Sequence, residues 1–240
     1  MLYRLYALTF ATFLLAGCEI QSKSTQVTMV PTWGDIPISL CEPIAELGGH
    51  VAQLQFYLSN FNVNGKPVDL LPDRSGSQIE QLVLVGGDCH TSQWDIEIPL
   101  NVRGSTLSFT LGVPFDVNHF NPLTQPSPLN VPEMFWTWQQ GHKFLRLDVA
   151  HEDGGWEFHL GSIGCQSASV MRAPKASCSS PNRYEYTVLM DETLQINLDL
   201  KTLLNNVTVK TARACMGEIK DKHCQMVMTN LEKPIFRSGQ

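Results

Sequence analysis

The chain has 240 residues, of which 43% are hydrophobic and 17% are charged, and its formal net charge is −6. This length suits one large β domain, because all-β sandwiches can run to about 200 residues or more without splitting. The acidic balance argues against nucleic acid as a partner, since the sequence has no basic stripe to displace counterions from phosphates.

The N-terminus has the pattern of a bacterial lipoprotein signal. Arg4 precedes an apolar run from 5 to 15, and Leu-Ala-Gly-Cys occupies positions 15–18. Small residues of this kind precede a signal-peptide cleavage site. We therefore expect residues 1–17 to be a signal peptide and the thiol of Cys18 to be lipidated. An ordinary signal peptide with an incidental cysteine is the alternative.

A lipid would tether the mature chain to the membrane rather than carry it across. The apolar run is shorter than the roughly 20 residues that a bilayer-spanning helix needs. Residues 18–26 are then expected to form a tether, and Glu19 after the lipidated position favours the outer membrane. The chain is predicted to lie in the cell envelope, on the periplasmic face of the outer membrane or at the cell surface.

Six cysteines remain once Cys18 is assigned to the lipid, and an even number in an oxidising compartment argues for disulfides. Close spacing favours two local bonds, and elimination leaves the third. The predicted pairs are Cys41–Cys89, Cys165–Cys178 and Cys215–Cys224. A thiolate metal cluster is the alternative, but the sequence has no C-x-x-C pair. Sulfur held in a disulfide cannot ligate a metal.

Short runs with strand character recur through residues 27–240. Residues 51–63 alternate apolar and polar positions, and Asn64-Gly65 then turns the chain into a hairpin. Further strands are expected at 68–71, 79–86, 94–100, 105–113, 143–149, 156–161, 184–190 and 194–200. Helix is expected only as a turn or two around 132–139 and 200–205. The pattern predicts a single all-β domain, an antiparallel two-sheet β-sandwich with long loops.

Residues 111–148 place a histidine, two tryptophans and a proline-rich loop side by side. His119 follows a predicted strand, where a strand end can present its side chain to a pocket. Trp136 and Trp138 would share a face in a strand and diverge in a helix. The combination indicates a candidate site. Core packing is the alternative, because large aromatic side chains often anchor cores.

Two further histidines stand in informative contexts. His159 lies in a predicted strand and opens the segment HLGSIGC at 159–165, while His142 opens the strand that follows the tryptophans. A strand histidine is often only hydrogen-bonded, which is the alternative for both. The histidines expected to be solvated loop residues are His50, His90, His151 and His223.

Conventional catalytic motifs are missing from the sequence, which has no G-x-S-x-G, no H-E-x-x-H and no phosphate-binding Gly-rich loop. It also has no C-x-x-C-H motif for covalent haem. The chain is therefore not expected to be an enzyme.

Several sequence blocks occur in an order that carries a family resemblance. They are FYLSNFNVNGKPV (56–68), LGVPFDVNH (111–119), PLN (128–130), MFWTWQQGHKFLRLD (134–148), HLGSIGC (159–165), CSSPNR (178–183), CM (215–216) and Cys224. Together they closely resemble the methanobactin-associated MbnP-like family of copper-binding proteins, also described as the four-Cys member of a metallo-mystery pair. The resemblance covers nearly the whole mature chain.

The resemblance implies an envelope protein that binds a single Cu(I) ion for copper acquisition or handling. It also implies a dihaem partner, related to cytochrome c peroxidases, that oxidises one tryptophan to kynurenine. Carried onto matching positions, the implied ligands are His119 and His159. The implied oxidised residue is Trp136 or Trp138. Where the family pattern usually reads GYKF, this chain has His142, which becomes a further candidate ligand.

These residue types suit copper. Neutral imidazoles bind copper well when thiolates are absent. An intact indole N–H can only donate a hydrogen bond, whereas opening the indole ring frees an aryl amine that can coordinate a metal. Metal-bound imidazoles normally donate their other N–H to an acceptor, for which Asp116 and Asp148 are candidates. The alternative function is a structural or ligand-binding envelope lipoprotein with no metal, in which the aromatic side chains only pack.

Overall fold

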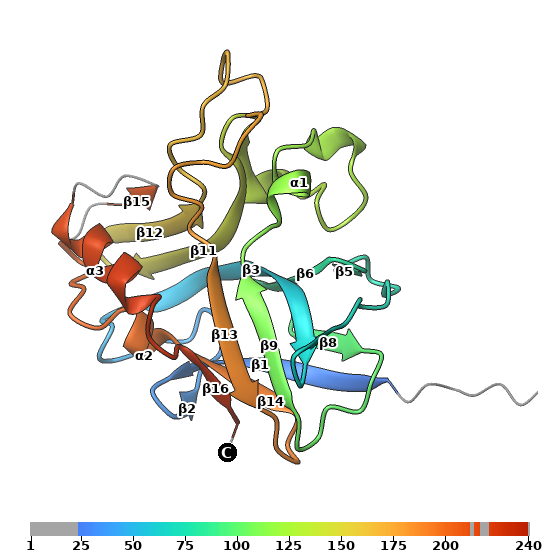
Figure 1. The fold of residues 1–240 in the computed structure, drawn as a ribbon. Coiled ribbons are helices and arrows are strands. Elements are labelled where there is room, and N and C mark those ends of the chain that lie inside the picture. The colour runs from blue at the N-terminus through green and yellow to red at the C-terminus, as the bar shows by residue number, and fades with distance from the viewer. Residues whose placement is uncertain (1–23, 212–213, 217–220, 240) are drawn as a thin grey trace, which may run out of the picture.

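The computed structural model of the protein describes residues 24–211, 214–216 and 221–239 (Figure 1). The expected signal peptide and its lipidation site, Cys18, lie outside the described residues. Within the described part of the chain, no helix is long and apolar enough to cross a membrane.

The smaller of the two sheets has five strands, with β1 at its centre. β1 pairs in parallel with β14 and antiparallel with β2 and β8, and β16 extends the sheet beyond β14. The strands are β1 (Thr25–Trp33), β2 (Ile36–Pro37), β8 (Asp95–Ile98), β14 (Gln195–Asp199) and β16 (Phe236–Ser238). Most of the chain separates β1 from β14, and parallel strands require a long connection of this kind.

The larger sheet has eleven strands and carries the site described below. Its main path runs β13-β9-β3-β11-β12-β15. These strands are β3 (His50–Val63), β9 (Thr106–Leu111), β11 (Gly141–His151), β12 (Gly154–Gly161), β13 (Tyr184–Leu189) and β15 (Cys215–Met216). The shorter strands that complete the sheet are β4 (Lys66–Pro67), β5 (Gln78–Ile79), β6 (Leu82–Asp88), β7 (Ser92–Gln93) and β10 (Phe135–Thr137).

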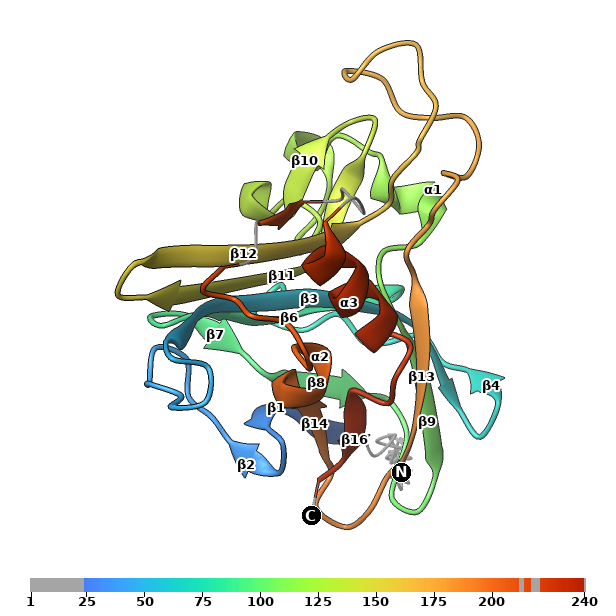
Figure 2. The same ribbon diagram turned by 90° about the vertical axis from the view of Figure 1, so that its left-hand side faces the viewer.

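The two sheets lie one above the other (Figure 2). The core between them is rich in aromatic side chains. Strict alternation in β9 turns Leu107, Phe109 and Leu111 inward. From the smaller sheet, the ring centroid of Phe236 lies 5.2 Å from that of Phe109 and 5.8 Å from that of Phe56. Burying a side chain of this size contributes about 1.5–3 kcal/mol. These contacts therefore hold the two sheets together.

The predicted all-β two-sheet fold is confirmed, with two corrections. The β1–β14 and β12–β15 pairs are parallel, so the sheets are mixed rather than wholly antiparallel. The tether expected at 18–26 is also too long. β1 begins at Thr25, and Thr25 and Gln26 already pair with Ile98 and Glu97 of β8.

Helices are short and lie in the connections. The turn η2 (Pro132–Met134) and α2 (Leu200–Leu203) fall where the sequence predicts helical turns. The sequence pattern does not anticipate α1 (Phe115–Asn118), η1 (Pro122–Thr124) or α3 (Lys222–Asn230). Asp221 caps α3, because its carboxylate accepts hydrogen bonds from the backbone N–H groups of His223 at 2.8 Å and Cys224 at 3.4 Å.

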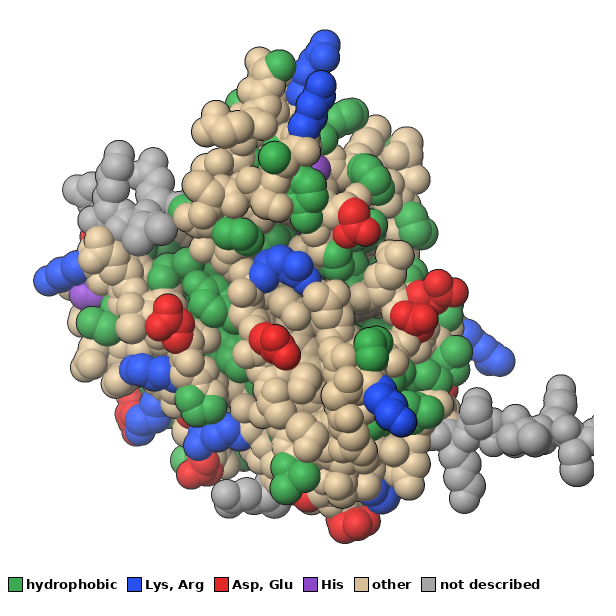
Figure 3. Space-filling model, in the orientation of Figure 1, with side chains coloured by type: hydrophobic (Ala, Val, Ile, Leu, Met, Phe, Trp, Pro, Cys, Tyr) green, Lys and Arg blue, Asp and Glu red, His purple; other side chains and the backbone are tan. Residues whose placement is uncertain are grey.

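The surface mixes charges of both signs. On the face shown in Figure 3, Asp and Glu side chains are interspersed with Lys and Arg. A mixed face of this kind does not produce the single-sign field that steers a charged polymer towards a protein.

Three disulfides join the chain as the sequence predicts. They are Cys41–Cys89, Cys165–Cys178 and Cys215–Cys224. The third links β15 to α3, and both of its cysteines are buried. A covalent bond therefore holds the two-residue strand β15 in place.

We predict that the disulfides stabilise the domain to different extents, because loop-closure entropy grows with the number of residues enclosed. The sequence separation is 48 for Cys41–Cys89 and 9 for Cys215–Cys224. Replacing both cysteines by serine should lower the free energy of unfolding by about 4 kcal/mol for the longer loop and by about 2.5 kcal/mol for the shorter one. Urea unfolding of the two double variants measures the difference. Equal losses, or free thiols in the unreduced wild-type protein, would contradict this prediction.

Candidate metal centre

The last strands of the larger sheet have a polar outer face. In β12, Phe158 points into the core, so His159 and Gly161 point to the opposite face. β11 pairs with β12 in a register that sets Arg146 opposite His159. Asp148, two residues further along β11, shares that face. The register therefore brings an imidazole, a guanidinium and a carboxylate together.

Asp148 fixes the orientation of His159. Nε2 of His159 donates to Oδ1 of Asp148 at 2.9 Å, and Arg146 donates to Oδ2 from Nε at 2.9 Å and from Nη2 at 2.6 Å. Burial alone would raise the pKa of the Asp148 carboxyl, but the hydrogen bonds from His159 and Arg146 outweigh it and hold that pKa below its ordinary value. The carboxylate stays ionised and keeps the imidazole proton on Nε2.

In the neutral imidazole, the other ring nitrogen of His159 carries a lone pair. This atom, Nδ1, is buried and has no hydrogen-bond partner, and the whole residue is only 5% exposed. Leaving a buried polar atom unpaired costs about 1–3 kcal/mol. An imidazole backed by a carboxylate, with its opposite nitrogen open, is the usual arrangement of a histidine that ligates a metal.

Trp136 lies one same-face position away from His159. β10 pairs with β11 so that the rings of Phe135 and His142 meet, with centroids 5.0 Å apart, and the next residue, Trp136, turns to the other side. A Cβ at position 161 would stand 2.5 Å from Cζ3 and 3.1 Å from Cη2 of the indole. Only glycine at 161 leaves room for the ring, which therefore lies over β12 at Gly161, two residues along the strand from His159.

His119 lies directly after α1, and its side chain is buried. Its Nε2 faces the side-chain amide of Asn118 at 3.3 Å and Sγ of Cys178 at 4.0 Å, while its Nδ1 has no hydrogen-bond partner. Burial lowers the pKa of His119, although the backbone of Trp138 acts in the opposite direction. The ring is therefore neutral near pH 7 and can act as a nitrogen donor.

A ring nitrogen of His119 also forms a compact group with two sulfurs. This nitrogen and the Sγ atoms of Cys165 and Cys178 lie within 4.8 Å of one another. The two sulfurs form a disulfide, and disulfide sulfur has no thiolate to offer a metal. In this oxidised state, His119 is the only metal donor of the three.

His142 is fully buried between two carbonyl groups. Its Nδ1 lies 2.8 Å from the carbonyl oxygen of Asn118, and its Nε2 lies 2.9 Å from that of Leu129. Burial lowers the pKa of His142 against the effect of both carbonyls. Neither ring nitrogen faces space in which a metal could bind. The residue instead joins the loop around Leu129 to the end of α1.

The segment from Trp136 to Trp138, called the tryptophan segment below, lies near both candidate histidines. The ring of Trp136 lies against Gly161, on the face of β12 that carries His159, and the backbone of Trp138, just past the end of β10, lies close to His119. Among the described residues, no hydrogen bond or ring contact joins the two histidines directly. The sequence analysis did not single out Gly161. Its position two residues after His159 in a predicted strand would have placed both residues on one face of the sheet.

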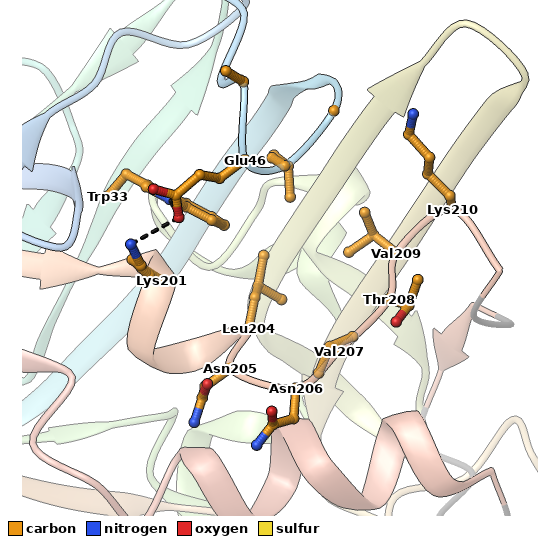
Figure 4. A pocket seen from close by; sticks show the side chains of 13 residues that line it. Trp33, Glu46, Lys201, Leu204, Asn205, Asn206, Val207, Thr208, Val209 and Lys210 are labelled. Atoms are coloured by element: carbon orange, nitrogen blue, oxygen red, sulfur yellow. Dashed lines mark hydrogen bonds and ion pairs between the residues drawn. The ribbon is translucent and has the colours of Figure 1, made fainter.

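A cavity of about 470 Å³ lies elsewhere, between β1, α2 and the chain that follows α2 (Figure 4). At its edge Nζ of Lys201 lies 2.7 Å from the carboxylate of Glu46, which also accepts a hydrogen bond of 3.0 Å from Nε1 of Trp33. None of the predicted site residues lines this cavity. Its size alone therefore does not make it the functional site.

We predict that Asp148→Asn lowers the free energy of unfolding at pH 7 by about 1–3 kcal/mol, because Arg146 and His159 lose a charged acceptor. The pKa of Asp148 is lower in the folded than in the unfolded chain. The ionised carboxylate therefore contributes fully to the free energy of unfolding at pH values above the ordinary pKa of 3.8, and this contribution is lost as the pH falls through the lowered pKa of the folded chain. Thermal unfolding should separate the variant from wild type most at neutral pH and least in strong acid. Asp153→Asn, in an exposed turn, is the control. A difference that does not shrink in acid would refute the ion-pair explanation.

Comparison with known proteins identifies the family. The model of the MbnP family matches residues 22–218. The solved structure of MbnP from Methylosinus trichosporium resembles this one with a TM-score of 0.71 and 21% sequence identity, over 85% of this chain and 86% of that chain, which shows a shared fold. No curated protein sequence matches the chain. Because the family model spans most of the chain, this protein belongs to the MbnP family.

Proposed function

We propose that this protein is a copper-binding lipoprotein of the cell envelope that holds a single Cu(I) ion and serves copper acquisition or handling. The observation that carries the proposal is Nδ1 of His159, a buried nitrogen without a partner on a ring whose other nitrogen is held by Asp148. Membership of the MbnP family, which is linked to copper handling, supports copper as the metal.

The side chains present suit Cu(I). This soft ion accepts few ligands, and neutral imidazole nitrogens are good donors to it when thiolates are absent. His159 provides an open lone pair. His119 provides a second imidazole, whose buried Nδ1 also has no hydrogen-bond partner. We leave out His142, because carbonyl groups occupy both of its nitrogens.

We propose that Trp136, rather than Trp138, is the residue oxidised to kynurenine, because its ring lies against Gly161, on the face of β12 that carries His159. Two equivalents of hydrogen peroxide would insert two oxygen atoms across the C2–C3 bond of the indole and leave as two waters. Hydrolysis would then release formate. The product carries a free aryl amine, which has the lone pair that an indole N–H lacks.

The oxidation is assigned to a dihaem partner related to cytochrome c peroxidases. Exposed apolar side chains in segments that adjoin the site support such docking. Phe120 and Leu123 are 49% and 86% exposed in the loop after α1, and Val170 is 56% exposed. The carbonyl of Val170 accepts a hydrogen bond of 3.3 Å from the backbone of Gln139, so it lies next to the tryptophan segment.

Protein produced together with this partner should carry a Trp136 that has one carbon fewer and one oxygen more, as mass spectrometry of a tryptic fragment would show. The modified form should bind one Cu(I). His159→Ala and His119→Ala should each weaken Cu(I) binding at least tenfold, or about 1.4 kcal/mol, since each removes a donor from a site that has few. Competition with a chromophoric Cu(I) chelator measures the affinity.

His50→Ala and Trp138→Phe are the controls, and both should leave binding and modification unchanged. Circular dichroism confirms that each variant is folded. Wild-type affinity in both histidine variants would refute the ligand assignment. Intact tryptophans and no bound copper, in protein made with the partner, would indicate instead a structural lipoprotein whose aromatic side chains only pack.

Membrane attachment is proposed to depend on Cys18, because Leu-Ala-Gly-Cys at 15–18 has the order of a lipoprotein cleavage site. Cys18→Ser should move the protein from the membrane fraction to the soluble envelope fraction, as cell fractionation and immunoblotting would show. A variant that still sediments with membranes would show that the anchor lies elsewhere.

A further inference from the structure

The disulfide Cys165–Cys178 joins the two ends of the loop 166–177, which projects beyond the larger sheet (Figure 1), and it lies beside His119. Nε2 of His119 is 4.0 Å from Sγ of Cys178. All three residues are buried. In the described part of the chain, no other three side chains of the types His, Cys, Asp and Glu come close enough together to hold a metal ion. Only the bond between the two sulfurs prevents them from acting as ligands.

The backbone holds the two cysteines together independently of their disulfide. Ile163 and Ser180 form an isolated antiparallel bridge, in which each backbone N–H donates to the carbonyl of the other, at 3.0 and 3.1 Å. Beside this bridge, the backbone N–H of Ser179 donates to the carbonyl of Gly164 at 3.4 Å. These bonds close the base of the loop. Breaking the sulfur–sulfur bond therefore leaves two thiols close to each other and to His119.

The separations within the group are close to those around a bound ion. Zinc lies about 2.3 Å from a thiolate sulfur and about 2.0 Å from an imidazole nitrogen, so tetrahedral angles require about 3.5 Å between nitrogen and sulfur. Nε2 of His119 and Sγ of Cys178 are 4.0 Å apart. The two sulfurs must separate to about 3.8 Å. Rotation about the Cα–Cβ bonds allows this once the disulfide is broken, because both cysteines lie in connections rather than in strands.

The imidazole of His119 is already in place for such a site. Its ring packs edge-on against that of Phe115, with centroids 5.2 Å apart. On the side of the sulfurs, its Nε2 has only a long contact of 3.3 Å with the side-chain amide of Asn118. The ring therefore needs no large movement to meet an ion bound by the two sulfurs, and a positioned donor of this kind is what a metal site requires.

We propose that reduction of the Cys165–Cys178 disulfide creates a metal site, in which two thiolates and Nε2 of His119 hold one thiophilic ion of the class of Zn(II) and Cu(I). A dithiol supplies two electrons and two hydrogens, so that the sulfur–sulfur bond breaks, two thiols form and the reductant leaves as a cyclic disulfide. Each thiol then loses its proton to solvent when the ion binds. The inference goes beyond the copper centre proposed above, because it needs neither His159 nor Trp136.

The test measures Zn(II) binding to protein produced without the dihaem partner, before and after reduction with a phosphine, which competes little for zinc. Reduced wild type should bind one more Zn(II) ion than reduced Cys165→Ser/Cys178→Ser, as competition with a chromophoric chelator would show. Co(II) in place of zinc should give a sulfur-to-metal charge-transfer band in reduced wild type that is absent from this variant. Cys215→Ser/Cys224→Ser is the matched control and should keep both the ion and the band.

His119→Ala should keep the thiols but weaken zinc binding at least about tenfold, since even the loss of a group that only orients a ligand costs that much. His119→Gln repeats the measurement if circular dichroism shows that the alanine variant is unfolded. Wild-type affinity in the folded histidine variant would overturn the assignment of Nε2. Equal zinc binding by reduced wild type and reduced Cys165→Ser/Cys178→Ser, or loss of the β-sheet dichroism of wild type on reduction, would overturn the site altogether.

The outcome is distinguishable from that of the copper proposal. If protein made with the partner binds no copper, while the reduced protein takes up zinc through Cys165, Cys178 and His119, the copper function fails and this inference stands. If copper binds as proposed and reduction adds no zinc site, the reverse holds.

Discussion

The pairing of β11 with β12 sets which side chains meet on the outer face of the larger sheet. In the observed register Arg146 stands opposite His159, and Asp148 reaches both of them. A slip of one residue would turn His159 into the core and Phe158 out to the solvent, because side chains alternate along a strand. The buried aromatic core therefore holds the polar site in register.

An irregularity in the same pairing prepares the place of Trp136. The register shifts between Lys143 and Leu145, so that Lys143 pairs with Gly161. Gly161 has no side chain, and the indole of Trp136 occupies the space that one would fill. The site thus depends on a glycine, a strand irregularity and a short strand, β10, that packs over β12.

The candidate donors differ in how ready they are for a metal. His159 has one nitrogen bonded to Asp148 and the other unpaired, and a metal that accepts the lone pair of the unpaired nitrogen would stabilise the fold. His119 also has an unpaired Nδ1, but no carboxylate orients its ring, because its Nε2 faces the amide of Asn118. His142 has a carbonyl oxygen against each of its ring nitrogens, which leaves neither nitrogen open to a metal. Three histidines of one neighbourhood therefore have three distinct roles, set by what lies next to each ring nitrogen.

The sequence by itself determined the fold class, the three disulfides and the family. Alternation of period two is a local property that predicts strands, and cysteine spacing restricts the pairing because short loops close easily. It also singled out His159 and the tryptophan pair as candidates, without showing what surrounds them. The parallel pairs β1–β14 and β12–β15 escaped prediction, because pairing between distant segments depends on the free energy of the whole sheet.

Only the tertiary structure decided which candidates are neighbours. The choice between Trp136 and Trp138 depends on β10 ending at Thr137 and on the empty position at Gly161. The approach of His119 to the sulfurs of Cys165 and Cys178 depends on connections that lie far apart in the sequence. Local patterns record which way a side chain points relative to its own strand. Which side chain it meets across the sheet is set by long-range register, and register is fixed only when the core packs.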